Sequence, residues 1–360
     1  MKKLLFTLIL FFSACYIFGQ IPTGYYTNAQ NKKGYALRYA LYNIIKSHTT
    51  ISYTGLWTAF QTTDVKSNGK VWDMYSDIPN QTPPYEFTFV SNQCGNYSGE
   101  GDCYNREHSV PASWFNDASP MYSDLFHLVP TDGYVNNRRS NHPFGDVNSA
   151  SWTSENGSKL GSSAVSGYTG TVFEPIDDYK GDFARALFYM SVCYMDKNLG
   201  QATTSMYTNG SLKPWAVTLL IQWHTLDPVS EKEINRNNAV YEKQGNRNPF
   251  IDYPELVGKI YGADSVNLFL PTSIHESENV TPRITFKNPT NTSLNLFYNL
   301  DLIEYQNITL TIFDLLGNKL KCIDVTNHPS QVDISDLSKG VYIVQFQYLE
   351  GKKSTKLIVQ

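Results

Sequence analysis

Residues 104–145 read YNREHSVPASWFNDASPMYSDLFHLVPTDGYVNNRRSNHPFG, and this stretch decides the local fold. Its segment SDLFHLVP predicts an extended, half-buried strand. Thr131 and Asp132 offer a helix N-cap, and GYVNNRRSN can form a short helix after them. Because PYEFTFVSNQ at 84–93 also predicts a short strand, we expect two strands followed by a helix.

The same stretch holds the candidate chemistry. A carboxylate and an imidazole, Glu107 and His108, precede the amide of Asn136 and the guanidinium groups of Arg138 and Arg139. Such a set can bind a hard metal ion and attack a phosphodiester. On an extended segment the adjacent side chains of Glu107 and His108 point to opposite faces. One of them is therefore expected to bind the metal while the other activates water.

These residues resemble the active-site region of the bacterial endonuclease I family, whose members carry a ββα-metal (His-Me finger) nuclease motif. The resemblance implies that Glu107 is a Mg²⁺ ligand and that His108 is the general base. It implies that Asn136 is the second metal ligand, with the adjacent Asn137 as its competitor. Mn²⁺ or Ca²⁺ could replace Mg²⁺ in such a site.

Several other residues of the 104–145 stretch allow more than one interpretation. Arg138 and Arg139 could clamp phosphate, although we expect one of them to be only a solvated helix charge. Arg106 could hold Glu107 in place. His127 could position a ligand or the scissile phosphate, or it could be a structural core histidine; Phe126 before it departs from the commonest family pattern. His142 is expected to be peripheral.

A second block, WHTLDPVSEKEINRNNAVYEKQGNRNPFIDYPE at 223–255, also resembles this family, most recognisably in its NRNPF segment. The resemblance extends from near residue 25 to near residue 265 and includes VWDMYSD at 71–77. Polar residues of the second block could form one buried network that supports the site: Asp227, Glu233, Arg236 and Arg247.

The N-terminal segment MKKLLFTLILFFSACYIFGQ predicts a secretory signal peptide that ends at Gln20. Lipidation of Cys15 is the alternative. In an exported protein, Cys94 and Cys103 could form a disulfide, whereas a zinc site would need more cysteine or histidine nearby. Cys193 lies in an apolar helical run and predicts a buried thiol.

Composition supports a globular protein without a general affinity for nucleic acid. Hydrophobic residues make up 41% and charged residues 17% of the 360 residues, and the net charge is −4. Within 94–146, acidic residues outnumber arginines and lysine is absent. A site of this charge needs a cation before it can approach phosphate, so composition favours a metal-dependent enzyme over a basic-groove binder.

The C-terminal part of the chain, from about residue 268, differs in composition from the part before it. A polar linker is expected at 268–284, and short β runs separated by turns then predict a small β-sandwich at 285–360. The blocks FDLLGNKL, DLSKGVYIV and the terminal KLIV resemble the C-terminal sorting domain of type IX secretion cargo. A carbohydrate- or surface-binding module is the alternative.

The whole chain is predicted to be α+β, with a mainly helical nuclease domain at 21–267. Helices are expected at 33–48, 177–196, 213–225 and 228–243, the last with a capping box at Ser230 and Glu233, and a surface loop is expected at 149–172.

The predicted function is a secreted, monomeric, Mg²⁺-dependent endonuclease with little sequence preference that acts on DNA or RNA. It would leave 5′-phosphate and 3′-hydroxyl ends. Two alternatives belong to other classes. One is a zinc hydrolase, for which no HExxH spacing exists, and the other is a non-catalytic surface adhesin.

Overall fold

The computed structural model divides the chain into two compact units, Met1–Pro271 and Thr272–Gln360, and each is described by itself. The structure describes residues 21–197, 199, 204–208, 211–262, 284–286, 289–290, 292–298, 309–325, 331–348 and 351–360. The predicted signal peptide and nearly all of the predicted linker lie outside these residues. Within them, no helix is both long and apolar enough to cross a bilayer.

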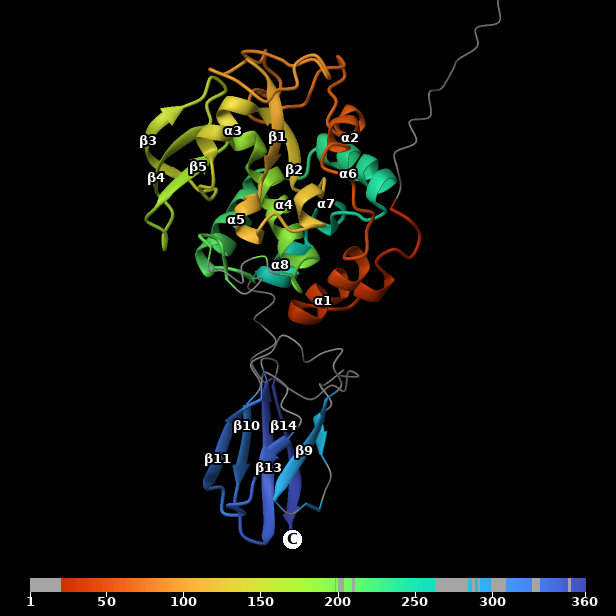
Figure 1. Ribbon diagram of the computed structural model, residues 1–360, viewed down its shortest axis with the longest axis vertical. Helices are drawn as coiled ribbons and strands as arrows, with labels where there is room; N and C mark the ends of the chain where they lie inside the picture. Colours follow the sequence, from red (N-terminus) through yellow and green to blue (C-terminus); the bar gives the residue numbers. More distant parts are fainter. Residues whose placement is uncertain are drawn as a thin grey trace, which may run out of the picture. The chain divides into compact units, whose positions relative to one another are not determined.

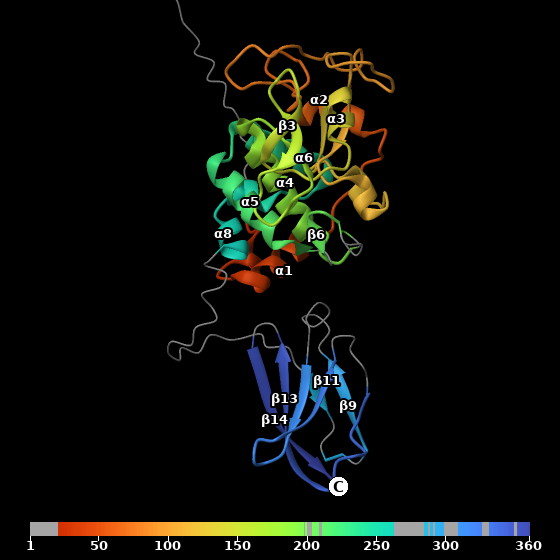
Figure 2. The same ribbon diagram turned by 90° about the vertical axis from the view of Figure 1, so that its left-hand side faces the viewer.

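The described residues of the first unit form helices and three small sheets (Figures 1 and 2). Its helices are α1 (Gly34–Ile45), α2 (Leu56–Thr63), α3 (Gly133–Arg139), α4 (Lys180–Cys193), α5 (Pro214–Leu226), α6 (Glu231–Gln244), α7 (Pro249–Asp252) and α8 (Leu256–Tyr261). Its strands are β1 (Tyr104–His108), β2 (Leu128–Asp132), β3 (Val147–Thr153), β4 (Lys159–Ser163), β5 (Thr171–Glu174), β6 (Tyr207–Thr208) and β7 (Ser211–Leu212). The α+β prediction is confirmed.

The four predicted helices correspond to α1, α4, α5 and α6. Almost the whole surface of α4 is buried, so this helix forms the centre of the unit and α1 and α5 pack against it. Pro214 starts α5, where its missing N–H costs no helical hydrogen bond. The capping box of α6 forms as expected: Ser230 accepts from the backbone of Glu233, whose side chain accepts from the backbone of Ser230.

The predicted order of two strands followed by a helix is present, but the first strand is formed by Tyr104–His108 and not by residues 84–93. β1 pairs antiparallel with β2, with His108 opposite Leu128, and α3 follows directly with the Asp132 side chain as its N-cap. Residues 84–93 are not a strand, and the prediction there is wrong. Their apolar residues pack onto a side chain of β1, as Phe87 does on Tyr104, and Val90 turns the chain with a φ of 67°.

The predicted loop at 149–172 is also wrong, because much of it forms the antiparallel sheet β3-β4-β5. The serines and glycines of this segment suggest a loop, but the pairing of β3 with β4 requires a small residue at one position. A Cβ at Gly161 would lie 2.1 Å from the carbonyl oxygen of Ser149. Glycine therefore permits the close approach of β3 and β4.

The described residues of the second unit form two antiparallel sheets, ordered β11-β10-β13-β14 and β12-β9-β8. Its strands are β8 (Ile284–Phe286), β9 (Ser293–Tyr298), β10 (Thr309–Phe313), β11 (Lys319–Asp324), β12 (Gln331–Asp333), β13 (Gly340–Tyr348) and β14 (Gly351–Val359). Apolar side chains of both sheets, such as Leu294 of β9 and Val344 of β13, belong to one buried cluster. Cys322 is exposed on β11.

Candidate active site

Glu107 points from β1 into the interior, with only 2% of its surface exposed. Its Oε1 accepts hydrogen bonds from the hydroxyl of Tyr75 (2.8 Å) and from Nη1 of Arg139 (3.0 Å). Burial raises the pKa of Glu107, while Arg139 and Tyr75 act in the opposite direction because they stabilise the carboxylate. Both of these hydrogen bonds end on Oε1, and the backbone N–H of His108 also stabilises the carboxylate.

His108 lies on the opposite face of β1, as the alternation of a strand requires. Its Nε2 is 3.1 Å from the carbonyl oxygen of Tyr122, and its ring packs 5.1 Å from the Tyr122 ring. A carbonyl oxygen can only accept, so Nε2 carries the proton and Nδ1 has the lone pair. Burial, followed by the nearby His127, lowers the pKa of His108 to about 3, which keeps the imidazole neutral.

Asn136 lies on α3 against the backbone of β1. Its Nδ2 donates to the carbonyl oxygen of Arg106, the residue before Glu107, at 3.4 Å. The amide oxygen is therefore turned away from this strand bond. Asn137 is exposed and donates instead to the hydroxyl of Tyr97 at 2.9 Å. Of the two asparagines, Asn136 is the one in contact with the strand that carries Glu107 and His108.

The two arginines at the end of α3 have different environments. Arg139 is 1% exposed, and besides Glu107 its guanidinium donates to the carbonyl oxygens of His108 (2.7 Å) and Ser109 (2.6 Å). It therefore joins the end of β1 to α3 and is not presented to a ligand. Arg138 is exposed and lies over the rings of Tyr134 and Trp152.

The surroundings of three other residues of the 104–145 stretch are also defined by the structure. His127 is fully buried; its Nε2 donates to the carbonyl oxygen of Met121 at 2.7 Å, and its ring lies 5.5 Å from that of His108. Arg106 does not contact Glu107, because its guanidinium lies 3.7 Å over the ring of Tyr53. His142 is half-buried beyond α3.

Two residues of the site were not singled out from the sequence. Tyr75 holds Glu107, and Asp73 accepts from the backbone N–H of Asp132 at 2.9 Å, at the start of α3. Burial, followed by repulsion from Asp132, raises the pKa of Asp73 to about 8. Both belong to the VWDMYSD segment, so the family resemblance of that segment was the available signal.

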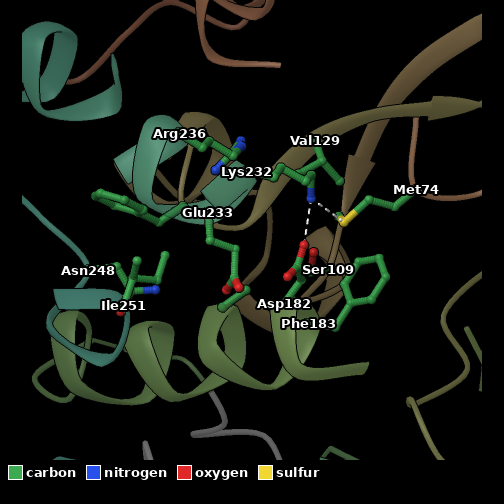
Figure 3. Close-up of a pocket in the computed structure, with 12 residues that line it drawn as sticks. Met74, Ser109, Val129, Asp182, Phe183, Lys232, Glu233, Arg236, Asn248 and Ile251 are labelled. Atoms are coloured by element: carbon green, nitrogen blue, oxygen red, sulfur yellow. Dashed lines mark hydrogen bonds and ion pairs between the residues drawn. The ribbon is translucent and has the colours of Figure 1, made fainter. Parts of the chain in front are cut away.

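A small cavity of about 30 Å³, lined by apolar and polar side chains, lies beneath β2, between α4 and α6 (Figure 3). Lys232 donates across it to Asp182 (2.5 Å) and lies 3.0 Å from the sulfur of Met74. The Ser109 hydroxyl lines it without a protein partner among the described residues. The cavity can hold about one or two water molecules, which would give that hydroxyl a partner.

The predicted buried network of 223–255 forms in part. Asp227, Glu233 and Arg247 are connected by hydrogen bonds that run through Arg185, Asn248, Asn237 and Asp252, whereas Arg236 pairs with Asp64. Arg185 binds Glu233 with two hydrogen bonds (2.5 and 2.7 Å) and reaches the carbonyl oxygen of Asp227. Arg236 binds Asp64 and the carbonyl oxygen of Leu128 (2.9 Å), which anchors β2 to α6. Arg247 binds Asp252. Only the Arg236 pair bears directly on the site.

Among the described residues, one group of histidine, cysteine and carboxylate side chains lies close enough together to hold a metal ion: His48, Asp124 and Cys193. Asp124 already accepts from the hydroxyls of Tyr189 (2.7 Å) and Tyr194 (2.6 Å). This group is a satisfied hydrogen-bond network in the core. The side-chain oxygens of Glu107 and Asn136 are hard donors, the type that Mg²⁺ and Ca²⁺ prefer.

The predicted disulfide between Cys94 and Cys103 is present, with its Cα atoms 5.2 Å apart, and Cys193 is buried as expected. The disulfide closes the loop before β1. A Cβ at Gly133, the first residue of α3, would lie 3.0 Å from the sulfur of Cys94. The bridge therefore packs on the start of the helix that carries Asn136.

Comparison with known proteins shows what the chain is similar to. The chain is 35% identical over 247 residues to an extracellular ribonuclease of Bacillus amyloliquefaciens, covering 66% of this chain and 78% of the relative. It is 33% identical over 243 residues to the extracellular ribonuclease of Bacillus subtilis, with the same coverage. An endonuclease-1 of Buchnera aphidicola is 27% identical over 129 residues, covering 36% of this chain and 46% of that protein.

Two family models match separate parts of the chain. Residues 285–360 match a secretion system C-terminal sorting domain, which marks the protein as secreted. Residues 33–255, which include every residue of the candidate site, match the Endonuclease I model. The chain belongs to the endonuclease I family.

Proposed function

We propose that this protein is a metal-dependent endonuclease in which His108 deprotonates the attacking water while Glu107 and Asn136 hold Mg²⁺. The observation that carries the proposal is the hydrogen bond from Nε2 of His108 to the carbonyl oxygen of Tyr122, which leaves Nδ1 as a lone-pair acceptor. Without this anchor the imidazole could present either nitrogen. The products would be 5′-phosphate and 3′-hydroxyl ends.

The electrostatics of His108 suit a base that is active only with substrate. In the free protein its low pKa keeps it neutral, so it is ready to accept a proton. A phosphate bound nearby brings negative charge, which stabilises the imidazolium and raises the pKa toward its ordinary value. Proton transfer from water is therefore favoured when the phosphodiester is in place.

Glu107 and Asn136 supply oxygen donors of the type that Mg²⁺ prefers, with Mn²⁺ or Ca²⁺ as possible substitutes. A bound divalent cation would neutralise charge on the phosphate and stabilise the leaving 3′ oxygen. Tyr75 and Arg139 orient the carboxylate of Glu107 through Oε1. We assign Arg139 to this positioning role, and His127 to packing behind His108. Arg138 is the arginine available to phosphate.

Both RNA and DNA are proposed substrates. The two Bacillus relatives are named extracellular ribonucleases, and the Buchnera relative is named an endonuclease. The proposed chemistry acts on the phosphodiester and uses neither a ribose hydroxyl nor a base edge, so it suits both polymers and little sequence preference is expected.

We further propose the layout of the whole chain: signal peptide at 1–20, nuclease domain at 21–267, linker at 268–284 and sorting domain at 285–360. The sorting domain would be a β-sandwich and would address the protein to the type IX secretion machinery. The nuclease is expected to act as a monomer.

The test is digestion of supercoiled plasmid DNA and of a folded RNA, each with Mg²⁺ or with EDTA. We expect EDTA to abolish cleavage and His108→Ala to lower the rate by about 10²- to 10⁴-fold. His142→Ala is the matched control, since this histidine is also half-buried near the end of α3, and it should cleave at nearly the normal rate. End-labelling of the products identifies the phosphate position. Cleavage that survives both EDTA and His108→Ala would contradict the mechanism.

A further inference from the structure

We propose that Tyr134 of α3 and Trp152 of β3, with Tyr97 beside them, form a platform on which unpaired bases of a single-stranded substrate stack. We call these three side chains the aromatic platform. The inference rests on the proposed nuclease function and specifies its substrate class. It predicts that single strands and unpaired regions bind in preference to a regular duplex.

The platform consists of three half-buried rings from three separate parts of the chain. The ring centroids of Tyr134 and Trp152 are 6.4 Å apart, and those of Tyr97 and Tyr134 are 6.5 Å apart, both in edge-to-face arrangements. All three residues are partly exposed, and Trp152 also packs against the main core. Partly exposed aromatic residues in a nuclease are suited to nucleobases, because every base has a flat face that can stack irrespective of sequence.

Arg138 gives this surface charge complementarity to a nucleic acid strand. It is exposed, and its guanidinium carbon lies 5.1 Å from the centre of the Tyr134 ring and 5.7 Å from that of Trp152. Nε and Nη2 donate to the Tyr134 hydroxyl at 3.2 and 2.7 Å. Within the described part of the chain, Nη1 has no such acceptor. The guanidinium thus lies over both rings and keeps Nη1 as a donor to offer to a phosphate.

A β-bulge aims Trp152 at α3. Ala150 pairs with Gly161 and Trp152 with Leu160, so Ser151 is the extra residue of β3. An extra residue shifts the alternation of side chains and bends the strand, which redirects the residues that follow. Gly161 allows the close approach opposite, as its contact with Ser149 shows.

Tyr97 is held independently. It lies in the loop closed by the Cys94–Cys103 disulfide, and its hydroxyl accepts from Nδ2 of Asn137 at 2.9 Å. A Cβ at Gly133 would lie 2.8 Å from its ring, so Tyr97 packs on the bare backbone at the start of α3. A disulfide loop, a helix and a bulged strand therefore converge on one surface.

The platform and the candidate catalytic residues lie on different sides of α3. Asn136 faces β1, whereas Tyr134 faces Trp152 of β3, and Figure 1 shows α3 between β1 and the sheet of β3, β4 and β5. A helix is about 10 Å across, so a strand of several nucleotides that is bound at the site can extend to the platform. In a regular duplex the base faces are covered by neighbouring base pairs, whereas an unpaired strand presents them. The platform thus favours single-stranded substrates.

The test measures binding without cleavage, by fluorescence anisotropy of end-labelled DNA in EDTA. Three probes of about 12 nucleotides are compared: a single strand, its duplex, and an abasic strand with the same phosphates. We expect Trp152→Ala to weaken single-strand binding by about 5- to 100-fold and to change duplex and abasic binding by less than about twofold. Trp152→Phe should retain most of the affinity.

Trp215→Ala is the matched control, because Trp215 is also half-buried but stacks on Tyr168 (4.7 Å) outside the platform; it should bind all three probes normally. Trp152→Leu keeps an apolar side chain for packing and serves if Trp152→Ala fails to fold. An equal loss on the abasic strand, or no loss on the single strand, would overturn the platform. Since no bond is cleaved, this outcome is independent of whether His108 is the base.

Discussion

Two adjacent arginines at the end of α3 show that a shift of one position along a helix decides whether a side chain is buried or exposed. Arg138 and Arg139 are separated by about 100° around the helix, so only one of them can face the interior. The structure turns Arg139 inward onto Glu107 and leaves Arg138 exposed. Helical periodicity predicts such a difference. Which arginine is buried depends on how α3 starts at Asp132 and packs on β1, and this is a tertiary contact.

Arg139→Ala should destabilise the fold by about 3–5 kcal/mol, because it leaves the buried carboxylate of Glu107 without its cationic partner. Arg139→Lys should recover only part of this loss, since an ammonium group lacks the planar fork that reaches Glu107 and two carbonyl oxygens. Urea denaturation gives both values. The neighbouring Arg138→Ala, on the exposed side, should change stability by less than about 0.5 kcal/mol. Equal stability of the two alanine variants would refute the positioning role of Arg139.

At the scale of elements, two helical glycines predict opposite responses to the same change. A Cβ at Gly181 in α4 would lie 2.0 Å from the carbonyl oxygen of Asp227 and 2.6 Å from Nη2 of Arg185. Gly181→Ala must therefore displace the backbone after α5 or the buried Arg185, and we expect a loss of more than about 2 kcal/mol. A Cβ at Gly258 in α8 would meet nothing within 4 Å, so Gly258→Ala should gain up to about 1 kcal/mol. Thermal unfolding of the two variants should shift in opposite directions. An unchanged or higher unfolding temperature of Gly181→Ala would show that the contact at Gly181 is not tight, and a lower one for Gly258→Ala would contradict the expected gain at Gly258.

Elements with strong periodicity could be predicted from the sequence, and those defined by partners could not. The apolar spacing of α1 and the capping box of α6 are local features, so both helices were predicted correctly. The alternation at 84–93 reflects packing of Phe87 on Tyr104 and not strand pairing. In β3 and β4 the serines and glycines carry no apolar alternation, and only the partner strand reveals the sheet. The site residues were recognisable because they lie in motifs, whereas Tyr75 acts through a contact 32 positions away in the chain.

At the scale of the whole molecule, buried titratable groups make stability depend on pH in two opposite ways. Burial lowers the pKa of His108 to about 3 and that of His224 to about 4. Between these pH values and about pH 6.5, the ordinary histidine pKa, the unfolded chain therefore binds more protons than the native protein. Stability should therefore fall as the solution is acidified through this range. Asp73 has the opposite effect, because its native pKa of about 8 lies far above its unfolded value. It holds its proton in the native state between about pH 4 and 8, so its contribution is lost as the pH rises through this window.

Asp73→Asn isolates the second effect. Both oxygens of Asp73 accept backbone N–H groups, from Tyr75 at 2.7 Å and from Asp132 at 2.9 Å, so an amide loses one of these bonds at every pH. The absolute stability of the variant should fall, and the informative quantity is the slope. The useful pH range lies between about 6.5, the ordinary histidine pKa, and about 8, the pKa of Asp73. In this range the free energy of unfolding of the wild type should decrease more steeply with pH than that of Asp73→Asn. The exposed Asp178→Asn is the control and should keep the wild-type slope. Parallel slopes for all three proteins would mean that Asp73 is ionised in the native state, and that the start of α3 is not stabilised by a buried protonated carboxyl group.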